Sequence, residues 1–162
     1  MNEQRFWTLI EEGWQVAGGM EKERDQLLSG ELSENDANQL MDASGAMVET
    51  LREKLAALNQ DELLQFDRIL ERKLYDIDRA EIQERTDGSE DGFLYARGFI
   101  VAAGKAYYDA VHAKPAIAMM DLECEDMCYL SWHVYRERFG EMPKSAISRE
   151  SCSNQAGWPD LT

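Results

Sequence analysis

Two charged residues lie on helix faces that are otherwise apolar, and they are the residues whose chemistry most needs a partner. At 100° per residue, Arg97 falls between Phe93 and Val101 on one apolar arc, and Asp67 falls beside Leu63 on another. A buried charge costs several kcal/mol unless an opposite charge and hydrogen bonds satisfy it. We therefore predict that Asp67 and Arg97 form a buried ion pair. The alternative is that one or both reach solvent at a helix edge.

Aromatic residues near Arg97 permit a second interpretation. Tyr95 and Tyr108 belong to the same apolar segment as Arg97, and Asp67 at the base would complete a pocket with convergent polar groups. Because a core with one buried ion pair explains the same pattern, we favour a structural role. A small-molecule pocket around Arg97 is the alternative.

Metal and thiol chemistry is suggested by Cys124, Cys128 and His133. The two thiols share a helix face, but His133 is displaced from Cys124 by about half a turn. A zinc site needs four convergent ligands, and no second pair of closely spaced cysteines exists. We predict two small core residues, and no metal, cofactor or catalytic residue. The phosphate-loop, GxSxG and HExxH motifs are absent from the sequence.

The charge of the chain favours some partners over others. The 162 residues include 32 acidic and 17 basic residues, giving a formal net charge of −15. Such a charge repels nucleic acids and anionic membrane surfaces, and it favours a basic protein as partner. The chain has no apolar run of membrane-spanning length and no signal-like N-terminal segment. With three cysteines, an odd number, we predict reduced thiols and a cytoplasmic location.

Helical periodicity accounts for most of the chain, and no segment alternates as a strand does. The main helices are predicted at residues 3–17, 46–58, 61–79, 89–112 and 121–139. Residues 89–112 are the least polar and should form the centre, with a kink or division at Gly104. Ser33 should cap a short surface helix over residues 34–43. The prediction is an all-α fold with five or six main helices in a single compact domain.

The predicted helical domain covers residues 1–140, and composition changes twice along the chain. Residues 20–45 are strongly polar and are predicted to be a surface insertion, with a break at Ser44-Gly45. Residues 141–162 form a polar C-terminal tail that is either disordered or laid across the body.

Five segments, taken in order, carry a resemblance to a known family. They are RFWTLIE at residues 5–11, residues 51–58, ELLQFDR at 62–68, SEDGFLYAR at 89–97 and residues 129–143. Together they resemble the bacterial family of unknown function DUF 4240, whose members occur alone or beside WGR-type modules in proteins likened to molybdate-metabolism regulators. Residues 20–45 look inserted relative to that family. The resemblance implies a small helical domain without a known activity, and it places Asp67 and Arg97 in two family-like segments.

These observations favour an acidic, non-enzymatic helical protein of the bacterial cytoplasm that acts in protein interaction or regulation. A sharper version is an immunity-type or antitoxin-like protein that neutralises a basic toxin by charge complementarity. The alternative is a small-molecule sensor or enzyme that uses a pocket around Arg97.

Overall fold

Helices make up the regular structure of the residues that the computed structural model describes, which are 1–86 and 89–161. Thr162, the last residue of the predicted tail, lies outside them. The α-helices in these residues are α1 (Glu3–Val16), α2 (Glu21–Ser29), α3 (Glu34–Ala56), α4 (Gln60–Asp76), α5 (Ala80–Thr86), α6 (Glu90–Ala102), α7 (Lys105–Ala113), α8 (Glu125–Cys128) and α9 (Leu130–Phe139). Three short 3₁₀ helices, η1 (Pro115–Ile117), η2 (Gln155–Gly157) and η3 (Pro159–Leu161), complete them. The predicted all-α class is confirmed. None of these helices is long and apolar enough to cross a bilayer.

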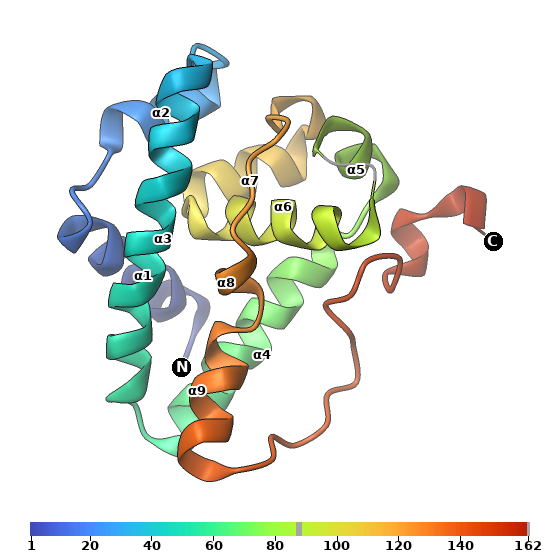
Figure 1. Cartoon of the computed structure of the whole chain (residues 1–162). Coiled ribbons are helices and arrows are strands. Elements are labelled where there is room, and N and C mark those ends of the chain that lie inside the picture. The colour runs from blue at the N-terminus through green and yellow to red at the C-terminus, as the bar shows by residue number, and fades with distance from the viewer. Residues whose placement is uncertain (87–88, 162) are drawn as a thin grey trace.

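Helix α6 lies at the centre of the fold and packs against α3, α4, α5, α7 and α8 (Figure 1). The Ser89 side chain accepts a hydrogen bond from the Gly92 amide and caps the helix, and two acidic residues in the first turn complement its dipole. The central position follows from composition, because every residue from Phe93 to Ala102 is buried except Tyr95. Arg97 is buried with them.

The structure has more helices than the five or six predicted, because backbone turns divide two of the predicted helices and because α2 and α5 form where no helix was predicted. Gly104 has φ +106°, a conformation that favours glycine, and it separates α6 from α7. In the predicted helix 121–139, Asp121 has φ +62° and the helical turn begins only at Glu125. Tyr129, at φ −124° and ψ 15°, then separates α8 from α9.

Residues 20–45, the predicted surface insertion, contribute several buried side chains to the core, although most of their residues lie at the surface. Leu27 and Leu40 are buried, and α2 packs against α7 and α3. Ser33 caps α3 as predicted, since its side chain accepts a hydrogen bond from the Asp36 amide. The predicted break at Ser44-Gly45 is wrong. The buried Ser44 hydroxyl donates to a carbonyl of its own helix, and α3 continues to Ala56.

The chain after α9 crosses the body as a C-terminal strap, defined here as residues 141–161 (Figure 1). It leaves α9 at Gly140, swings away from the helices and returns past α4 and α6 to end near α5. Its regular structure is limited to η2 and η3. Arg149 and Trp158 are nevertheless buried, at 4% and 7% exposure, so the strap is anchored at a few side chains.

Candidate functional site

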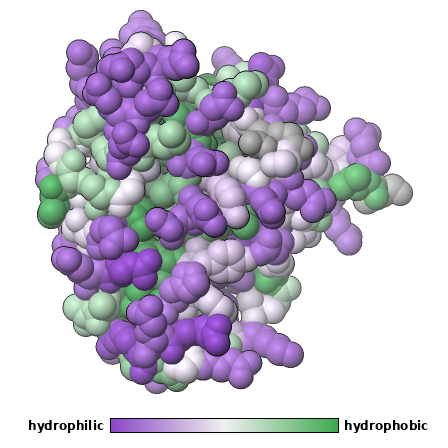
Figure 2. Space-filling model, viewed as in Figure 1, coloured by the Kyte–Doolittle hydropathy of each residue, from purple (hydrophilic) through white to green (hydrophobic). Residues whose placement is uncertain are grey.

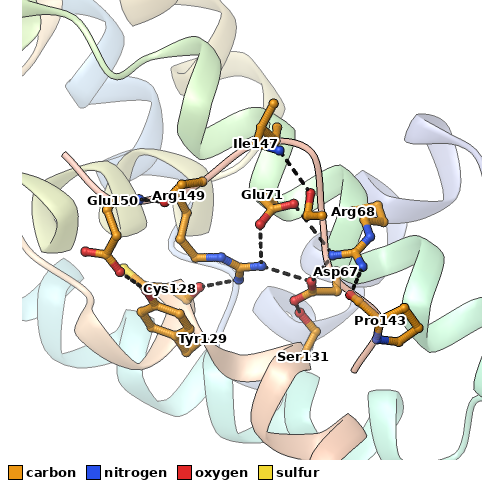
Figure 3. A network of polar contacts seen from close by, with 12 residues as sticks. Asp67, Arg68, Glu71, Cys128, Tyr129, Ser131, Pro143, Ile147, Arg149 and Glu150 are labelled. Carbon is orange, nitrogen blue, oxygen red and sulfur yellow. Dashed lines mark hydrogen bonds and ion pairs between the residues drawn. The ribbon is translucent and has the colours of Figure 1, made fainter. Parts of the chain in front are cut away.

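A buried carboxylate on α4 is the centre of a polar network beneath the strap (Figure 3). Asp67 has no exposed surface. One of its oxygens accepts a hydrogen bond from Ser131 Oγ at 2.8 Å, and the other accepts one from Arg149 Nη2 at 2.9 Å. Arg68 Nη1 lies 3.5 Å from the second oxygen. Because both oxygens are engaged, Asp67 is poorly placed to act as a general base.

Arg149 bridges the body and the strap. Its Nη1 donates to the Cys128 carbonyl at 2.8 Å, and its Nη2 lies 3.5 Å from Glu71 Oε1. The guanidinium also lies 5.0 Å from the centre of the Tyr129 ring. Burial alone would lower the pKa of Arg149, but the charge of Asp67, its hydrogen bond to the guanidinium and the charge of Glu71 together outweigh burial and raise the pKa. The guanidinium is therefore held in its charged form.

The predicted ion pair between Asp67 and Arg97 is wrong, although both residues are fully buried. Arg97 instead donates from Nη1 to the Leu74 carbonyl at 2.7 Å and to the Arg149 carbonyl at 3.0 Å. Its Nη2 donates to Ser151 Oγ at 3.1 Å. Leu74 lies seven residues beyond Asp67, which is about 10 Å along a helix, so Arg97 reaches a different part of α4.

A second buried carboxylate, Asp78, receives the end of the strap. Its oxygens accept hydrogen bonds from the amides of Cys152 and Asn154 at 3.0 and 2.9 Å and from Trp158 Nε1 at 3.0 Å. Burial lowers the pKa of Arg97, and the negative charge of Asp78 offsets part of that lowering. Asp78 was not among the predicted site residues, although the predicted helix 61–79 includes it; in the structure α4 ends at Asp76, and Asp78 lies in the turn that follows.

The predicted pocket around Arg97 does not form from Tyr95 and Tyr108. Tyr108 is buried, donates to the Lys73 carbonyl at 3.0 Å and packs on Trp7, and burial raises its pKa. Tyr95 is half-buried on another side of the core, where the charge of Glu125 raises its pKa. The two phenols therefore stabilise separate helix contacts and do not converge on Arg97.

A cleft of about 340 Å³ lies beside Asp67. Its floor and walls come from α4, from the aromatic residues Tyr129 and Trp132 and from strap residues 142–149. Arg68 closes one side by donating to the Pro143 carbonyl. Glu71 Oε2 is buried and accepts no hydrogen bond from the described residues; Arg68 is its nearest cation, at 3.6 Å. The cleft thus contains both charge signs, and the strap forms part of its wall.

A separate feature is an acidic face formed by residues 25–51 and 115–135, which contain no lysine or arginine. The two stretches are adjacent, since α2 contacts η1 and α3 contacts α8. Ten carboxylates belong to them, on Asp25, Glu31, Glu34, Asp36, Asp42, Glu49, Asp121, Glu123, Glu125 and Asp126, and all but the half-buried Asp36 are exposed. Hydrophilic residues cover most of the side viewed in Figure 2, including the end formed by α2 and the start of α3.

Two clefts open where these stretches meet. One of about 230 Å³ is mainly apolar and lies between residues 26–32 and 116–119. Gln26 Oε1 lines it and accepts no hydrogen bond within the described residues. The other, of about 270 Å³, has Met41 and Cys124 among its walls and Glu123, Glu125 and Asp126 on one side. The acidic face therefore combines negative charge with apolar recesses.

The cysteines are held as thiols. Burial raises the pKa of Cys124 to about 11 and that of Cys128 to about 12. Cys128 Sγ donates to the Leu94 carbonyl at 3.3 Å, while His133 is exposed and packs on Trp132. Across residues 1–86 and 89–161, no three His, Cys, Asp or Glu side chains are grouped so that they could hold a metal ion.

Some participants in the polar network follow a pattern in the sequence and others do not. Glu71 lies four residues after Asp67 and so on the same face of α4, a spacing that could have identified it. Arg149 lies in a polar stretch without helical periodicity, where no local pattern distinguishes it from an exposed arginine.

One protein family matches the chain when its sequence is compared with family descriptions. Residues 32–137 match the family described as Protein of unknown function (DUF4240). Comparison with curated proteins and with solved structures gave no significant match. The matched segment contains Asp67, Asp78 and Arg97, whereas the strap that supplies partners to all three lies beyond it. Because the match spans more than half of the chain, the protein belongs to the DUF4240 family.

Proposed function

We propose that this protein is a non-enzymatic helical interaction module that binds a basic protein partner. The observation that carries the proposal is the acidic face, where ten carboxylates occur on two adjacent stretches that have no lysine or arginine. A surface of one charge sign attracts a partner of the opposite sign, increases the rate of association and disfavours wrong partners.

The basic residues elsewhere in the chain do not offset this face, because most of them are used internally. At least ten of the seventeen basic side chains contact a carboxylate of the same chain, and Arg97 is buried. Among these ion pairs of the described residues, that of Arg52 with Glu49 at 3.7 Å uses a carboxylate of the acidic face, and the charge of the other nine carboxylates is left for an external cation.

The state of the potentially reactive groups supports a role without catalysis. Asp67 accepts hydrogen bonds on both oxygens, and Asp78 accepts three. The raised pKa values of Cys124 and Cys128 keep these thiols protonated near neutral pH, which makes them poor nucleophiles. Each of these groups stabilises the fold in its unreactive form.

The proposal places the protein in the bacterial cytoplasm, where its three free cysteines remain reduced. In its sharper form, the partner is a basic toxin that this protein neutralises as an immunity or antitoxin protein. Charge complementarity would supply the fast association that such neutralisation requires.

Affinity capture with charge-reversed variants tests the proposal. The Glu123→Lys/Glu125→Lys variant reverses two charges of the acidic face, and Glu53→Lys/Glu137→Lys reverses two exposed charges outside residues 25–51 and 115–135. We expect the wild-type chain and the control variant to capture the same basic protein in a salt-sensitive manner. The acidic-face variant should bind that purified protein about tenfold or more weakly. Equal binding by both variants would contradict the proposal.

A second candidate function, small-molecule sensing, is favoured by the cleft beside Asp67. Glu71 Oε2 is buried there without a hydrogen bond, so a ligand with an N–H donor would satisfy it. A thermal-shift screen with small amines tests this function. An amine that raises the Tm of the wild-type chain should not raise the Tm of the Glu71→Ala variant. If no amine raises the Tm of the wild-type chain, this result would count against small-molecule sensing.

A further inference from the structure

Three fully buried charged groups of the body find partners in the C-terminal strap. Asp67 pairs with Arg149, Arg97 donates to Ser151, and Asp78 accepts hydrogen bonds from two strap amides and from Trp158. A buried charge without a partner costs several kcal/mol, so the body needs some segment in this position. The need arises within residues 32–137, yet the strap lies outside that family-matched segment.

The strap contacts the body as a bound peptide does, through a few anchors separated by exposed residues. Arg149 and Trp158 are buried, whereas Glu150 and Gln155 are exposed. Between residues 140 and 154 the strap forms no helix or strand, and its amides at Cys152 and Asn154 donate to a side chain of the body. Main-chain hydrogen bonds with pockets for selected side chains are a general mode of peptide recognition.

Two slots define which side chains the groove under the strap accepts. The first takes a guanidinium, which lies over Tyr129 and is held by the Cys128 carbonyl and by the carboxylates of Asp67 and Glu71 (Figure 3). The planar N–H donors of a guanidinium match this carbonyl and these two carboxylates, and the ammonium group of a lysine would satisfy these acceptors less completely. The second slot takes an indole.

The indole slot lies between Asp78 and Phe93. Trp158 Nε1 donates to Asp78 Oδ1 at 3.0 Å, and its ring meets Phe93 edge to face at 5.9 Å and 77°. The two anchors, Arg149 and Trp158, are nine residues apart in sequence.

We propose that this groove is a peptide-binding site that the strap occupies in the free protein. Its ligand is a segment of a partner protein that carries an arginine and, nine residues later, a tryptophan. The groove uses none of the ten carboxylates of the acidic face, so this inference goes beyond the proposed function and does not depend on it. The partner segment displaces the strap and takes over its contacts with Asp67, Asp78 and Arg97.

The structure favours displacement of the strap. The cleft of about 340 Å³ runs beside Arg149 and gives a competing segment room to enter before the strap leaves. On its N-terminal side the strap is held by the buried Met142 and by the hydrogen bond from Arg68 to the Pro143 carbonyl, while the side chains of Pro143 and Lys144 are exposed. A tethered segment competes at an effective concentration in the millimolar range, so weakening the strap should make the groove accessible to added peptide.

The test uses the full chain with Arg149→Ala, which weakens the strap, and a synthetic peptide of strap residues 141–161. We expect saturable binding by fluorescence anisotropy and a rise in Tm as the added peptide supplies the missing guanidinium. A peptide with Arg149→Ala should bind at least about tenfold more weakly, and one with the exposed Glu141→Ala should bind as the parent peptide does. The wild-type chain should bind the parent peptide more weakly than the variant does.

Full-length Trp158→Ala provides a second host if Arg149→Ala fails to fold. Failure of the parent peptide to bind either folded variant would overturn the proposal. Unfolding of the whole body in both variants, without rescue by the peptide, would also overturn it, because the strap would then be an inseparable part of the core. Neither result alters the expected salt-sensitive capture by the acidic face.

Discussion

At the scale of single residues, the position of a buried charge and the identity of its partner are separate questions. Asp67 and Arg97 both lie on apolar helix faces and both are fully buried. Each finds its hydrogen bonds elsewhere, Asp67 with Ser131 and Arg149, and Arg97 with carbonyls and Ser151. Carbonyl and hydroxyl oxygens accept from both Nη atoms of Arg97, while its buried Nε has no hydrogen-bond partner among the described residues, so this guanidinium is buried without a contacting carboxylate.

A double-mutant cycle tests the pairing that the structure shows. Arg149→Ala and Asp67→Ala should each lower the free energy of unfolding by about 3–5 kcal/mol, because each leaves the opposite charge buried without its partner. The double mutant should lose less free energy of unfolding than the two single variants lose together. Urea denaturation measures all three, and Arg149→Ala combined with the distant, exposed Glu53→Ala should be additive within about 0.5 kcal/mol. Losses under about 1 kcal/mol for both single variants would contradict a buried ion pair.

The buried thiols predict a loss of stability in alkaline solution. The folded pKa values of Cys124 and Cys128, about 11 and about 12, exceed the value of about 8.5 for an unfolded cysteine. Above pH 8.5 the unfolded chain loses these protons before the folded chain does, so stability present below that pH falls as pH rises toward 11–12. Urea midpoints at pH 8 and pH 10.5 measure the decline.

Comparison with a variant isolates the contribution of the thiols to this decline. In Cys124→Ala/Cys128→Ala the urea midpoint should fall less between the two pH values, because two groups with raised folded pKa values are gone. An identical decline in both proteins would show that the thiols do not titrate as proposed.

At the scale of elements, α4 and α6 position the polar network because each carries its charge on a face that the core requires. Helix α4 begins at a capping box between Asn59 and Glu62, which fixes its register. Asp67 and Glu71 then project from one side of it toward the strap. Helix α6 lies close to α8 because Gly98 has no side chain at the contact.

Two glycines inside helices should respond oppositely to alanine. A Cβ at Gly98 would lie 2.5 Å from the Cys124 carbonyl oxygen and 2.6 Å from Cys128 Sγ, so Gly98→Ala should destabilise the protein by about 1–3 kcal/mol. A Cβ at Gly45 meets no atom within 4 Å, so Gly45→Ala should stabilise the protein by up to about 1 kcal/mol through helix propensity. Thermal denaturation compares the Tm values of the two variants with that of the wild-type chain, and equal shifts in Tm would refute the close α6–α8 contact.

At the scale of the whole molecule, charge is distributed unevenly. The acidic face has no lysine or arginine, whereas the cleft beside Asp67 is lined by Arg68, Lys144 and Arg149. Self-repulsion on the acidic face opposes folding and favours binding of an oppositely charged partner. The same face therefore costs stability in the free protein and supplies the attraction that the proposed function requires.

Neutralising part of this face should stabilise the free protein. Glu31→Gln/Asp42→Asn/Glu123→Gln removes three exposed charges without changing side-chain size. We expect Tm to rise by about 2–4 °C at low ionic strength and the gain to shrink in 0.5 M salt, where the Debye length falls to a few ångströms. Differential scanning calorimetry measures both, and a gain that is independent of salt would contradict self-repulsion.

The sequence by itself determined the features of this protein that depend on neighbours within one or two helical turns. The all-α class, the cap at Ser33, the central position of α6 and the burial of Asp67 and Arg97 all follow from helical period and capping chemistry. These features are local because the direction of each side chain on a helix depends only on its position along that helix.

Only the tertiary structure decided which groups meet and where the chain breaks between helices. Arg149 joins Asp67 from 82 residues away, out of a polar segment whose burial is set by the groove it enters and not by its own pattern. The division at Tyr129 and the burial of Leu27 and Leu40 depend likewise on packing. A charged residue on the apolar face of a helix indicates that a partner is needed, but long-range packing determines which residue that partner is.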